Sequence, residues 1–299
     1  MSAPAWLTAR PIAHRGLHDV ARGVVENTLP AFEAAVARNC AIELDVQPSS
    51  DGEAMVFHDE TLDRLTDGRG PIAARDRAAL ERLRFKGSDA RIPTLTEVLD
   101  VVAGRVPVLI EVKHEGRSTR QLEARAVECV RSYAGLAGLM SFEPESVEII
   151  RKLAPEILRG VIAMRYDDPE SERDIPPLRR LSLRHLLHAP RTQPQFVSYD
   201  VRGLPSAGPL LLRRLGVPLL TWTVRRPEQV AVARRYADQI IFEDLDPERL
   251  DPEGLDPERL DPEGLDPEDL DPEGLDPERP DADAEAQGVS GARRRPPGP

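Results

Sequence analysis

Five polar clusters lie at the ends of apolar runs in the first part of the chain. They are His14-Arg15-Gly16, Glu26-Asn27-Thr28, Glu43-Leu44-Asp45, His58-Asp59 and Glu111-Val112-Lys113. Together they supply two imidazoles for proton transfer, carboxylates able to hold a hard cation, and two fixed positive charges. This combination suits the cleavage of a phosphoester with the help of a divalent metal.

Three acidic residues form the candidate metal site. Glu43 and Asp45 are two residues apart on an expected strand, so their side chains share one face. Two carboxylates in one space repel each other unless a cation lies between them. Glu111, at the end of a later strand, adds a third oxygen ligand, and such a set favours Mg²⁺ or Ca²⁺ over structural zinc. The alternative is that one of these acids sits at a barrel rim and pairs with Arg or Lys.

Two histidines are candidates for proton transfer. His14 follows the first expected strand, and Arg15 beside it offers a planar fork that matches phosphate oxygens. His58 supplies the second group that general acid–base cleavage needs. Lys113 shares a strand face with Glu111 and could neutralise a phosphate oxygen. The alternative for His14 is a loop histidine beside a surface arginine.

The other four histidines have no comparable partners in the sequence. We expect them to be surface or packing residues: His18, His114, His185 and His188.

Up to about residue 245, short apolar runs alternate with amphipathic stretches. The runs are nearly all apolar, as strands buried on both faces should be. Eight strands are expected, at 11–14, 41–46, 106–112, 139–142, 158–164, 195–198, 218–224 and 239–242. Helices are expected at 28–38, 94–103, 119–132 and 226–236. This order predicts an α/β fold, a TIM (β/α)8 barrel over residues 1–245.

One interval breaks this alternation. Residues 47–105 separate the second and third barrel strands and hold a short apolar segment, a Gly-rich turn and a charged helix near 75–83. We expect a small insertion on a βα loop, the side of a barrel where active sites are built.

Beyond the barrel, residues 246–279 repeat an Asp-Pro-Glu-Gly-Leu type pentapeptide in seven consecutive copies. A proline every fifth residue excludes a continuous α-helix. One leucine per repeat buries too little surface to offset the entropy of ordering the chain. We predict that the acidic tail, residues 246–299, is disordered.

Charge and composition limit the partners. The repeat carries 15 acids and three arginines, a net charge of −12 that equals the charge of the whole chain. The remainder is neutral overall and has no field that would attract nucleic acid. Only two cysteines occur, Cys40 and Cys129, which predicts reduced buried thiols. Without a signal-like start or a long apolar run, we expect a soluble cytoplasmic protein with no membrane insertion.

The clusters resemble, in order and spacing, the glycerophosphodiester phosphodiesterase family. The resemblance covers roughly residues 10–243 and also includes Pro93-Thr94-Leu95, Ser141-Phe142 and Trp222-Thr223-Val224. It implies a TIM barrel with an insertion after the second strand. It also implies metal-dependent hydrolysis of a small-molecule glycerophosphodiester to sn-glycerol 3-phosphate and an alcohol, recovering glycerol phosphate from deacylated phospholipids.

The resemblance also implies a role for each matching position. One divalent cation, Mg²⁺ or Ca²⁺, would be held by Glu43, Asp45 and Glu111. His14 and His58 would be the acid–base pair. The residues expected to contact or order the substrate are Arg15, Glu26, Asn27 and Lys113 around the phosphate, and Phe142 and Trp222 around the alcohol.

Two positions depart from the family pattern. Arg225 follows Trp-Thr-Val where the family commonly has Asn, and Glu243 ends the last strand where Thr-Asp is common. We expect these residues to affect substrate choice, with the extra cation favouring an anionic head group, rather than catalysis.

Three other functions remain open from the sequence: two enzymatic and one noncatalytic. The same barrel could act as a lysophospholipase D or as a phosphoinositide phospholipase C-like enzyme, although the insertion is charged rather than apolar. A noncatalytic protein that captures a partner through the acidic repeat is the third.

Overall fold

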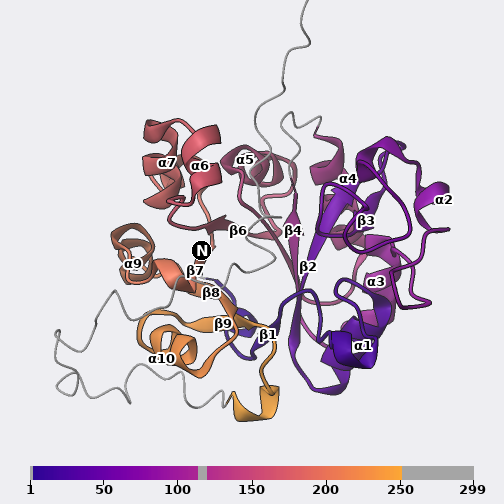
Figure 1. Ribbon diagram of the computed structural model, residues 1–299. Helices are drawn as coiled ribbons and strands as arrows, with labels where there is room; N and C mark the ends of the chain where they lie inside the picture. Colours follow the sequence, from indigo (N-terminus) through magenta and orange to yellow (C-terminus); the bar gives the residue numbers. More distant parts are fainter. Residues whose placement is uncertain (1–2, 114–119, 251–299) are drawn as a thin grey trace, which may run out of the picture.

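The computed structural model describes residues 3–113 and 120–250, and shows a closed barrel of parallel strands surrounded by helices (Figure 1). The barrel strands are β1 (Ile12–Ala13), β2 (Ala41–Pro48), β4 (Val108–Val112), β5 (Ala137–Ser141), β6 (Leu158–Ala163), β7 (Phe196–Asp200), β8 (Leu219–Val224) and β9 (Gln239–Phe242). The barrel closes because β1 pairs in parallel with both β2 and β9. The predicted TIM barrel is confirmed.

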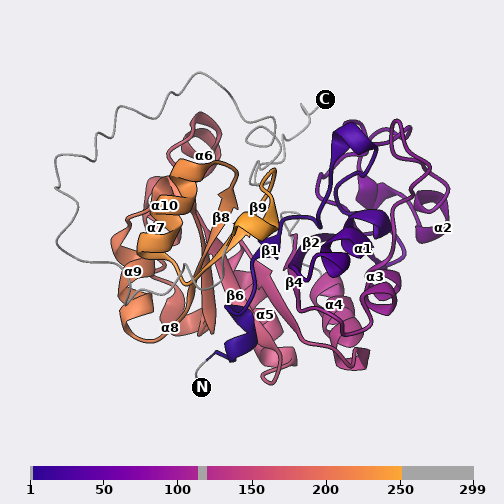
Figure 2. The same ribbon diagram turned by 90° about the horizontal axis from the view of Figure 1, so that it is seen from below.

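Helices form the outer layer. They are α1 (Leu29–Ala37), α3 (Leu95–Val102), α4 (Gln121–Ser132), α5 (Pro144–Leu153), α6 (Pro169–Asp174), α7 (Pro177–Arg184), α8 (Ala189–Thr192), α9 (Ala207–Arg214) and α10 (Pro227–Tyr236). Figures 1 and 2 show α1, α3 and α4 on one side of the barrel and α7, α9 and α10 on the other. Within residues 3–113 and 120–250, no helix is long and apolar enough to cross a bilayer.

The sequence of α3 shows why these segments become helical. Thr94 caps the first turn by accepting a hydrogen bond from the Glu97 amide, and the Glu97 carboxylate accepts one from the Thr94 amide. The apolar stripe then faces inward, with Leu95, Val98, Leu99 and Val102 all buried. The capping residues and the apolar stripe indicate the same helix, which spans Leu95–Val102 and lies within the predicted range 94–103.

The segment after β2 leaves the barrel and forms a small core of its own. It holds β3 (Ala54–Val56), antiparallel to β2, a 3₁₀ turn at Ile72–Ala74 and the short helix α2 (Arg77–Leu80). Met55, Phe57, Leu62, Ile72, Leu80, Phe85 and Ile92 pack together in it. The charged helix near 75–83 is shorter than predicted because the chain turns after Leu80 and brings the Phe85 ring to 6.0 Å from that of Phe57. Since α3 packs on α1, the interval 47–105 contains both this excursion and a helix of the outer ring.

The first copy of the repeat extends the ordered chain beyond the expected boundary at residue 245. Pro247–Arg249 forms a 3₁₀ turn, and Leu250 is buried in the main apolar cluster. Arg38 Nη2 lies 2.9 Å from Asp246 Oδ1 and ties this copy to the end of α1. The disorder predicted for the rest of the tail concerns residues 251–299, which lie outside the described residues.

Candidate active site

The predicted functional side chains stand at the carboxyl ends of the barrel strands. Their polar groups meet in one cavity, which also has apolar walls. It is lined by His14, Arg15, Glu43, Asp45, His58, Glu111, Lys113, Phe142 and Trp222, together with Met140, Ile162, Ser198 and Ile241. Glu26 and Asn27 lie behind this lining and contact it. The structure therefore brings together the residues that were predicted to form the site.

Strand register brings the three acids together. Asp45 of β2 is in register with Glu111 of β4, and Glu43 precedes Asp45 by two residues on the same face. One carboxylate oxygen from each lies within 4.8 Å of the others, and all three residues are buried. Burial, followed by the charges of the other two carboxylates, raises the pKa of Glu43 well above its ordinary value. A cation would relieve this repulsion.

Lys113 reaches into the acidic cluster from just beyond β4. Its Nζ lies 2.9 Å from Asp45 Oδ1 and 2.7 Å from Glu111 Oε1. Burial opposes the charge of Lys113, but the two carboxylates outweigh it and raise the pKa of the ammonium. The pairing of rim acids with a basic residue, the alternative to a metal site, thus describes part of the contacts of Asp45 and Glu111. Glu43 faces the same space without an ion pair to Lys113.

Arg15 lies buried beneath the acids and links them to the first loop. Its Nη1 lies 2.8 Å from Glu26 Oε1, and its Nε lies 3.4 Å from Asp45 Oδ2. Asn27 Nδ2 donates to the same Asp45 oxygen at 2.8 Å. Arg15 and Asn27 both adopt left-handed backbone conformations, with φ of 54° and 55°. Such strain in non-glycine residues persists only where surrounding contacts fix it, and it clusters at functional sites.

Gly16 allows this loop to approach the helix that follows it. A Cβ at Gly16 would lie 2.9 Å from the backbone carbon of Ala31 in α1, and φ is +80°. Both the close approach and the backbone angle therefore require glycine. The sequence cluster His-Arg-Gly thus combines a proton-transfer candidate, a phosphate-binding candidate and the turn that places them.

His58 enters the site from the excursion after β2. Its Nδ1 lies 2.8 Å from Asp59 Oδ1, and its carbonyl accepts a hydrogen bond from Gln47 Nε2 at 3.0 Å. Burial, then the charges of Arg15 and Lys113, lowers the pKa of His58 to about 4. The imidazole is therefore neutral at pH 7.

Arg64 completes a chain of ion pairs that the sequence did not reveal. It contacts both Asp59 oxygens, through Nε at 2.7 Å and Nη2 at 2.8 Å. It also contacts both Glu26 oxygens, at 2.9 and 3.1 Å. The excursion is thereby tied to the first loop through charged side chains. Arg64 belongs to no motif, and its role depends on two loops that meet only in the fold.

His14 is held from the opposite side by the last strand. Its Nδ1 lies 2.9 Å from Glu243 Oε2, and its Nε2 lies 4.0 Å from Glu43 Oε2. Burial and the charge of Arg15 lower the pKa of His14, and Glu243 opposes this shift. Glu243 was expected to act on substrate choice, so its direct contact with His14 was missed. The signal was available, because the last barrel strand is always the neighbour of the first.

Two more residues lie beside Glu243 at this rim. Arg225 Nη2 lies 2.9 Å from Glu243 Oε2, so one of its nitrogens contacts a carboxylate. His18, expected to be a surface or packing residue, has Nε2 3.6 Å from Glu243 Oε1, and its side chain is 8% exposed. Both residues thus belong to the group around Glu243.

Aromatic side chains form the apolar wall of the cavity. The rings of Phe142 and Trp222 meet edge to face with centroids 5.4 Å apart. Trp222 Nε1 donates to the Ser198 carbonyl at 3.2 Å, which fixes the indole. A rigid aromatic wall beside a charged centre suits a substrate with one polar and one less polar end.

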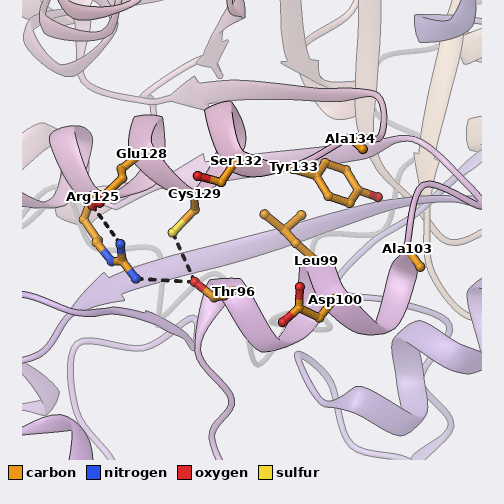
Figure 3. Close-up of a pocket in the computed structure, with 10 residues that line it drawn as sticks. All are labelled: Thr96, Leu99, Asp100, Ala103, Arg125, Glu128, Cys129, Ser132, Tyr133 and Ala134. Carbon is orange, nitrogen blue, oxygen red and sulfur yellow. Dashed lines mark hydrogen bonds and ion pairs between the residues drawn. The ribbon is translucent and has the colours of Figure 1, made fainter.

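A larger hollow lies outside the barrel, between α3 and α4 (Figure 3). Its polar groups contact one another: Arg125 Nη1 lies 2.7 Å from Glu128 Oε2, and Thr96 Oγ1 lies 3.5 Å from Cys129 Sγ. Burial raises the pKa of Cys129, which disfavours the reactive thiolate. The residues that line this hollow include neither a histidine nor a group of three carboxylates like that at the barrel mouth.

Comparison with known proteins agrees with this geometry. The chain matches the glycerophosphoryl diester phosphodiesterase family model over residues 14–246. It therefore belongs to this family.

Named relatives match part of the chain. It is 32% identical over 163 residues to a glycerophosphodiester phosphodiesterase of Caldanaerobacter subterraneus subsp. tengcongensis, covering 50% of this chain and 65% of the relative. It is 35% identical to human glycerophosphodiester phosphodiesterase 1, covering 50% of this chain and 47% of that protein. The matches thus span less than two thirds of these relatives.

Solved structures share the fold. An Oleispira antarctica phosphodiesterase in complex with the product sn-glycerol-3-phosphate superposes with a TM-score of 0.65 at 22% identity, covering 83% of this chain and 96% of that one. A Thermotoga maritima glycerophosphodiester phosphodiesterase gives a TM-score of 0.59 at 22% identity, covering 78% and 94%.

Proposed function

We propose that this protein hydrolyses glycerophosphodiesters to sn-glycerol 3-phosphate and an alcohol, with His14 and His58 as the acid–base pair. The observation that carries the proposal is the meeting of three buried carboxylates, two imidazoles and two cations in one cavity of a barrel of this family. Each group would have a task in phosphodiester cleavage.

The acidic cluster fits a divalent cation. Its donors are oxygens from Glu43, Asp45 and Glu111, and the raised pKa of Glu43 reflects burial and negative charge that a cation would offset. When bound, Mg²⁺ or Ca²⁺ would supply positive charge against the phosphoryl oxygens and make a nearby hydroxyl more acidic.

Arg15 and Lys113 would hold the phosphate beside the acids. Both are cations held by carboxylate partners: Glu26 contacts the buried Arg15, and Asp45 with Glu111 contacts the half-buried Lys113. Such pre-positioned charges stabilise the extra negative charge that develops on the phosphoryl oxygens during cleavage.

The two histidines would then move the protons. One imidazole removes a proton from the attacking hydroxyl, of water or of the glycerol 2-position, as the new P–O bond forms. The other, protonated at its remaining nitrogen, donates that proton to the alcohol oxygen as its bond to phosphorus breaks. Attack by water gives sn-glycerol 3-phosphate directly. Attack by the glycerol 2-hydroxyl gives a cyclic phosphate, which water then opens to sn-glycerol 3-phosphate with the roles of the two imidazoles reversed. Asp59 on His58 and Glu243 on His14 each bind Nδ1, which leaves Nε2 of both rings for this exchange.

Phe142 and Trp222 would contact the alcohol group. They line the same cavity as the charged residues and supply part of its apolar surface. We also propose a cytoplasmic location, supported by the two free cysteines, which persist in a reducing compartment.

The test is to incubate the protein and Mg²⁺ or Ca²⁺ with a panel of glycerophosphodiesters that differ in head group, and to monitor hydrolysis by ³¹P NMR. We expect sn-glycerol 3-phosphate as the phosphorus product. Adding lysophospholipids and phosphoinositides to the panel tests the related lipid activities. An enzyme with one of those activities would hydrolyse its lipid substrate faster than the glycerophosphodiesters. A truncated chain ending at Leu250 should remain fully active, whereas a binding protein that acts through its repeat would lose its function.

A further inference from the structure

The two residues that depart from the family pattern contact each other and then His14. Glu243 directly follows β9, and β9 pairs with β1 so that Phe242 is in register with Ala13. The His14 amide donates to the Phe242 carbonyl at 3.0 Å, which places residue 243 beside the imidazole. Glu243 Oε2 is then 2.9 Å from His14 Nδ1.

This contact fixes both the tautomer and the orientation of the ring. An ionised carboxylate only accepts hydrogen bonds, so Nδ1 must carry the proton. Although burial opposes its ionisation, Glu243 is kept ionised because His14 and Arg225 lower its pKa. Nε2 is left to face the acidic cluster, 4.0 Å from Glu43 Oε2. A ring held in this way has its proton-transfer atom aimed before the substrate arrives.

Arg225 in turn holds Glu243. It follows β8, and its Nη2 lies 2.9 Å from the same Glu243 oxygen that contacts His14. Its backbone amide donates to Gln229 Oε1 at 2.7 Å, so the start of α10 fixes the position of the arginine. His18 contacts the second oxygen, with Nε2 at 3.6 Å from Oε1. His14 and Arg225 therefore both contact Oε2, and His18 lies near Oε1.

We propose that Arg225 and Glu243 act as one unit of positioning residues, in which Arg225 orients Glu243 and Glu243 orients His14. The inference rests on the proposed function of His14. It is an alternative to the expectation that Arg225 favours anionic head groups, and it rests on the contact between one guanidinium nitrogen of Arg225 and Glu243. The unit acts on the rate of the chemical step and leaves substrate binding unchanged.

A double-mutant cycle tests the unit. Glu243→Gln and Glu243→Ala should lower kcat by about 10- to 100-fold, the loss typical for a removed partner of a functional histidine. KM should stay within about twofold, since the residues do not contact substrate. Arg225→Gln should lower kcat less. The double variant Arg225→Gln/Glu243→Gln should lose no more than Glu243→Gln alone, because Arg225 acts through Glu243.

The Asp200–Arg202 pair provides a matched control. It lies at the end of β7, with Arg202 Nη2 2.9 Å from Asp200 Oδ2, and neither residue lines the cavity. Arg202→Gln should therefore leave kcat unchanged. Additive losses in the Arg225/Glu243 cycle, or a change in head-group preference in Arg225→Gln, would overturn the proposal.

A measurement of the ring itself separates this inference from the proposed function. ¹⁵N NMR of histidine-labelled protein, with the His14 signals identified by their loss in His14→Asn, should show Nδ1 protonated in the wild type. In Glu243→Gln the tautomer should become mixed. An unchanged tautomer contradicts the inference even in a fully active enzyme. If the wild type hydrolyses no glycerophosphodiester, but the tautomer still differs between the wild type and Glu243→Gln as expected, only the proposed function is contradicted.

Discussion

Lys113 Nζ lies 2.9 Å from Asp45 Oδ1, so a fixed cation sits beside the carboxylate at the centre of the acidic cluster. The pair comes from two neighbouring strands, since Asp45 belongs to β2 and Lys113 follows β4. The lysine offsets part of the negative charge of the cluster, and burial together with the charges of Asp45 and Glu111 still raises the pKa of Glu43. Three carboxylates and one lysine leave the site with a net negative charge if all are ionised, and a divalent cation would offset this charge.

Metal removal should abolish activity. Treatment with a chelator should reduce hydrolysis by about 100-fold or more, because charge stabilisation at the phosphoryl group is among the largest catalytic effects. Adding Mg²⁺ or Ca²⁺ should restore the wild type. It should not restore Glu43→Gln, which lacks one ligand charge. Calorimetric titration of the wild type and the variant with each metal provides the check independent of turnover, and equal affinities would contradict the site.

Replacing either histidine should act on the chemical step. His14→Asn and His58→Asn should each lower kcat by about 10²- to 10⁴-fold, the usual contribution of a general acid or base. KM should change little. His185→Asn is the control, since His185 lies outside the cavity lining. Retention of kcat in either active-site variant, measured by release of the alcohol, would exclude that histidine from proton transfer.

The ion pairs of Glu26 should make the fold sensitive to acid. Burial opposes its ionisation, but Arg15 and Arg64 hold the pKa of Glu26 at about 2, below the ordinary value of 4.5. Between these values the unfolded chain binds more protons, so the free energy of unfolding falls as the pH is lowered from 4.5 to 2. The loss is on the order of 3 kcal/mol at most.

Urea unfolding at several pH values measures this effect in the wild type and in Glu26→Gln. The wild type should be the more stable protein above pH 4.5, and the difference should shrink as the pH falls. A difference that does not depend on pH would show that the carboxylate charge is not responsible.

The aromatic wall should determine which alcohols are accepted. Phe142→Ala removes a ring that meets Trp222 at 5.4 Å and opens the apolar end of the cavity. A lost large apolar contact is worth about 1.5–3 kcal/mol, so kcat/KM should fall by about 10- to 100-fold for a substrate with a large alcohol group. It should fall less for one with a small group. Equal losses across the panel of head groups would place Phe142 outside the alcohol site.

Sequence patterns predicted the barrel because each strand is an apolar run and each ring helix carries an apolar stripe. They also predicted the acidic cluster, since residues two apart on a strand share a face and strand ends meet in a barrel. The bounds of β9 agree with the prediction, whereas α2 is shorter because Phe85 must turn back onto Phe57.

The hydrophobic periodicity of the sequence could not predict side-chain contacts between loops. Arg64 joins Asp59 to Glu26 across segments far apart in the sequence, and no periodicity marks it. Glu243 and Arg225 could be recognised as unusual, but their pairing depends on side-chain geometry that only the fold displays. A residue that departs from the family pattern therefore says little about substrate specificity until the side chains that it contacts are known.

The most direct test of the central claim is the initial rate of sn-glycerol 3-phosphate release from a glycerophosphodiester, measured in the wild type and Glu43→Gln as Mg²⁺ or Ca²⁺ is titrated in. We predict a rate that rises from near zero and saturates with metal in the wild type, and stays near zero in the variant. Full activity without metal, or equal rates in the two proteins, would contradict the account.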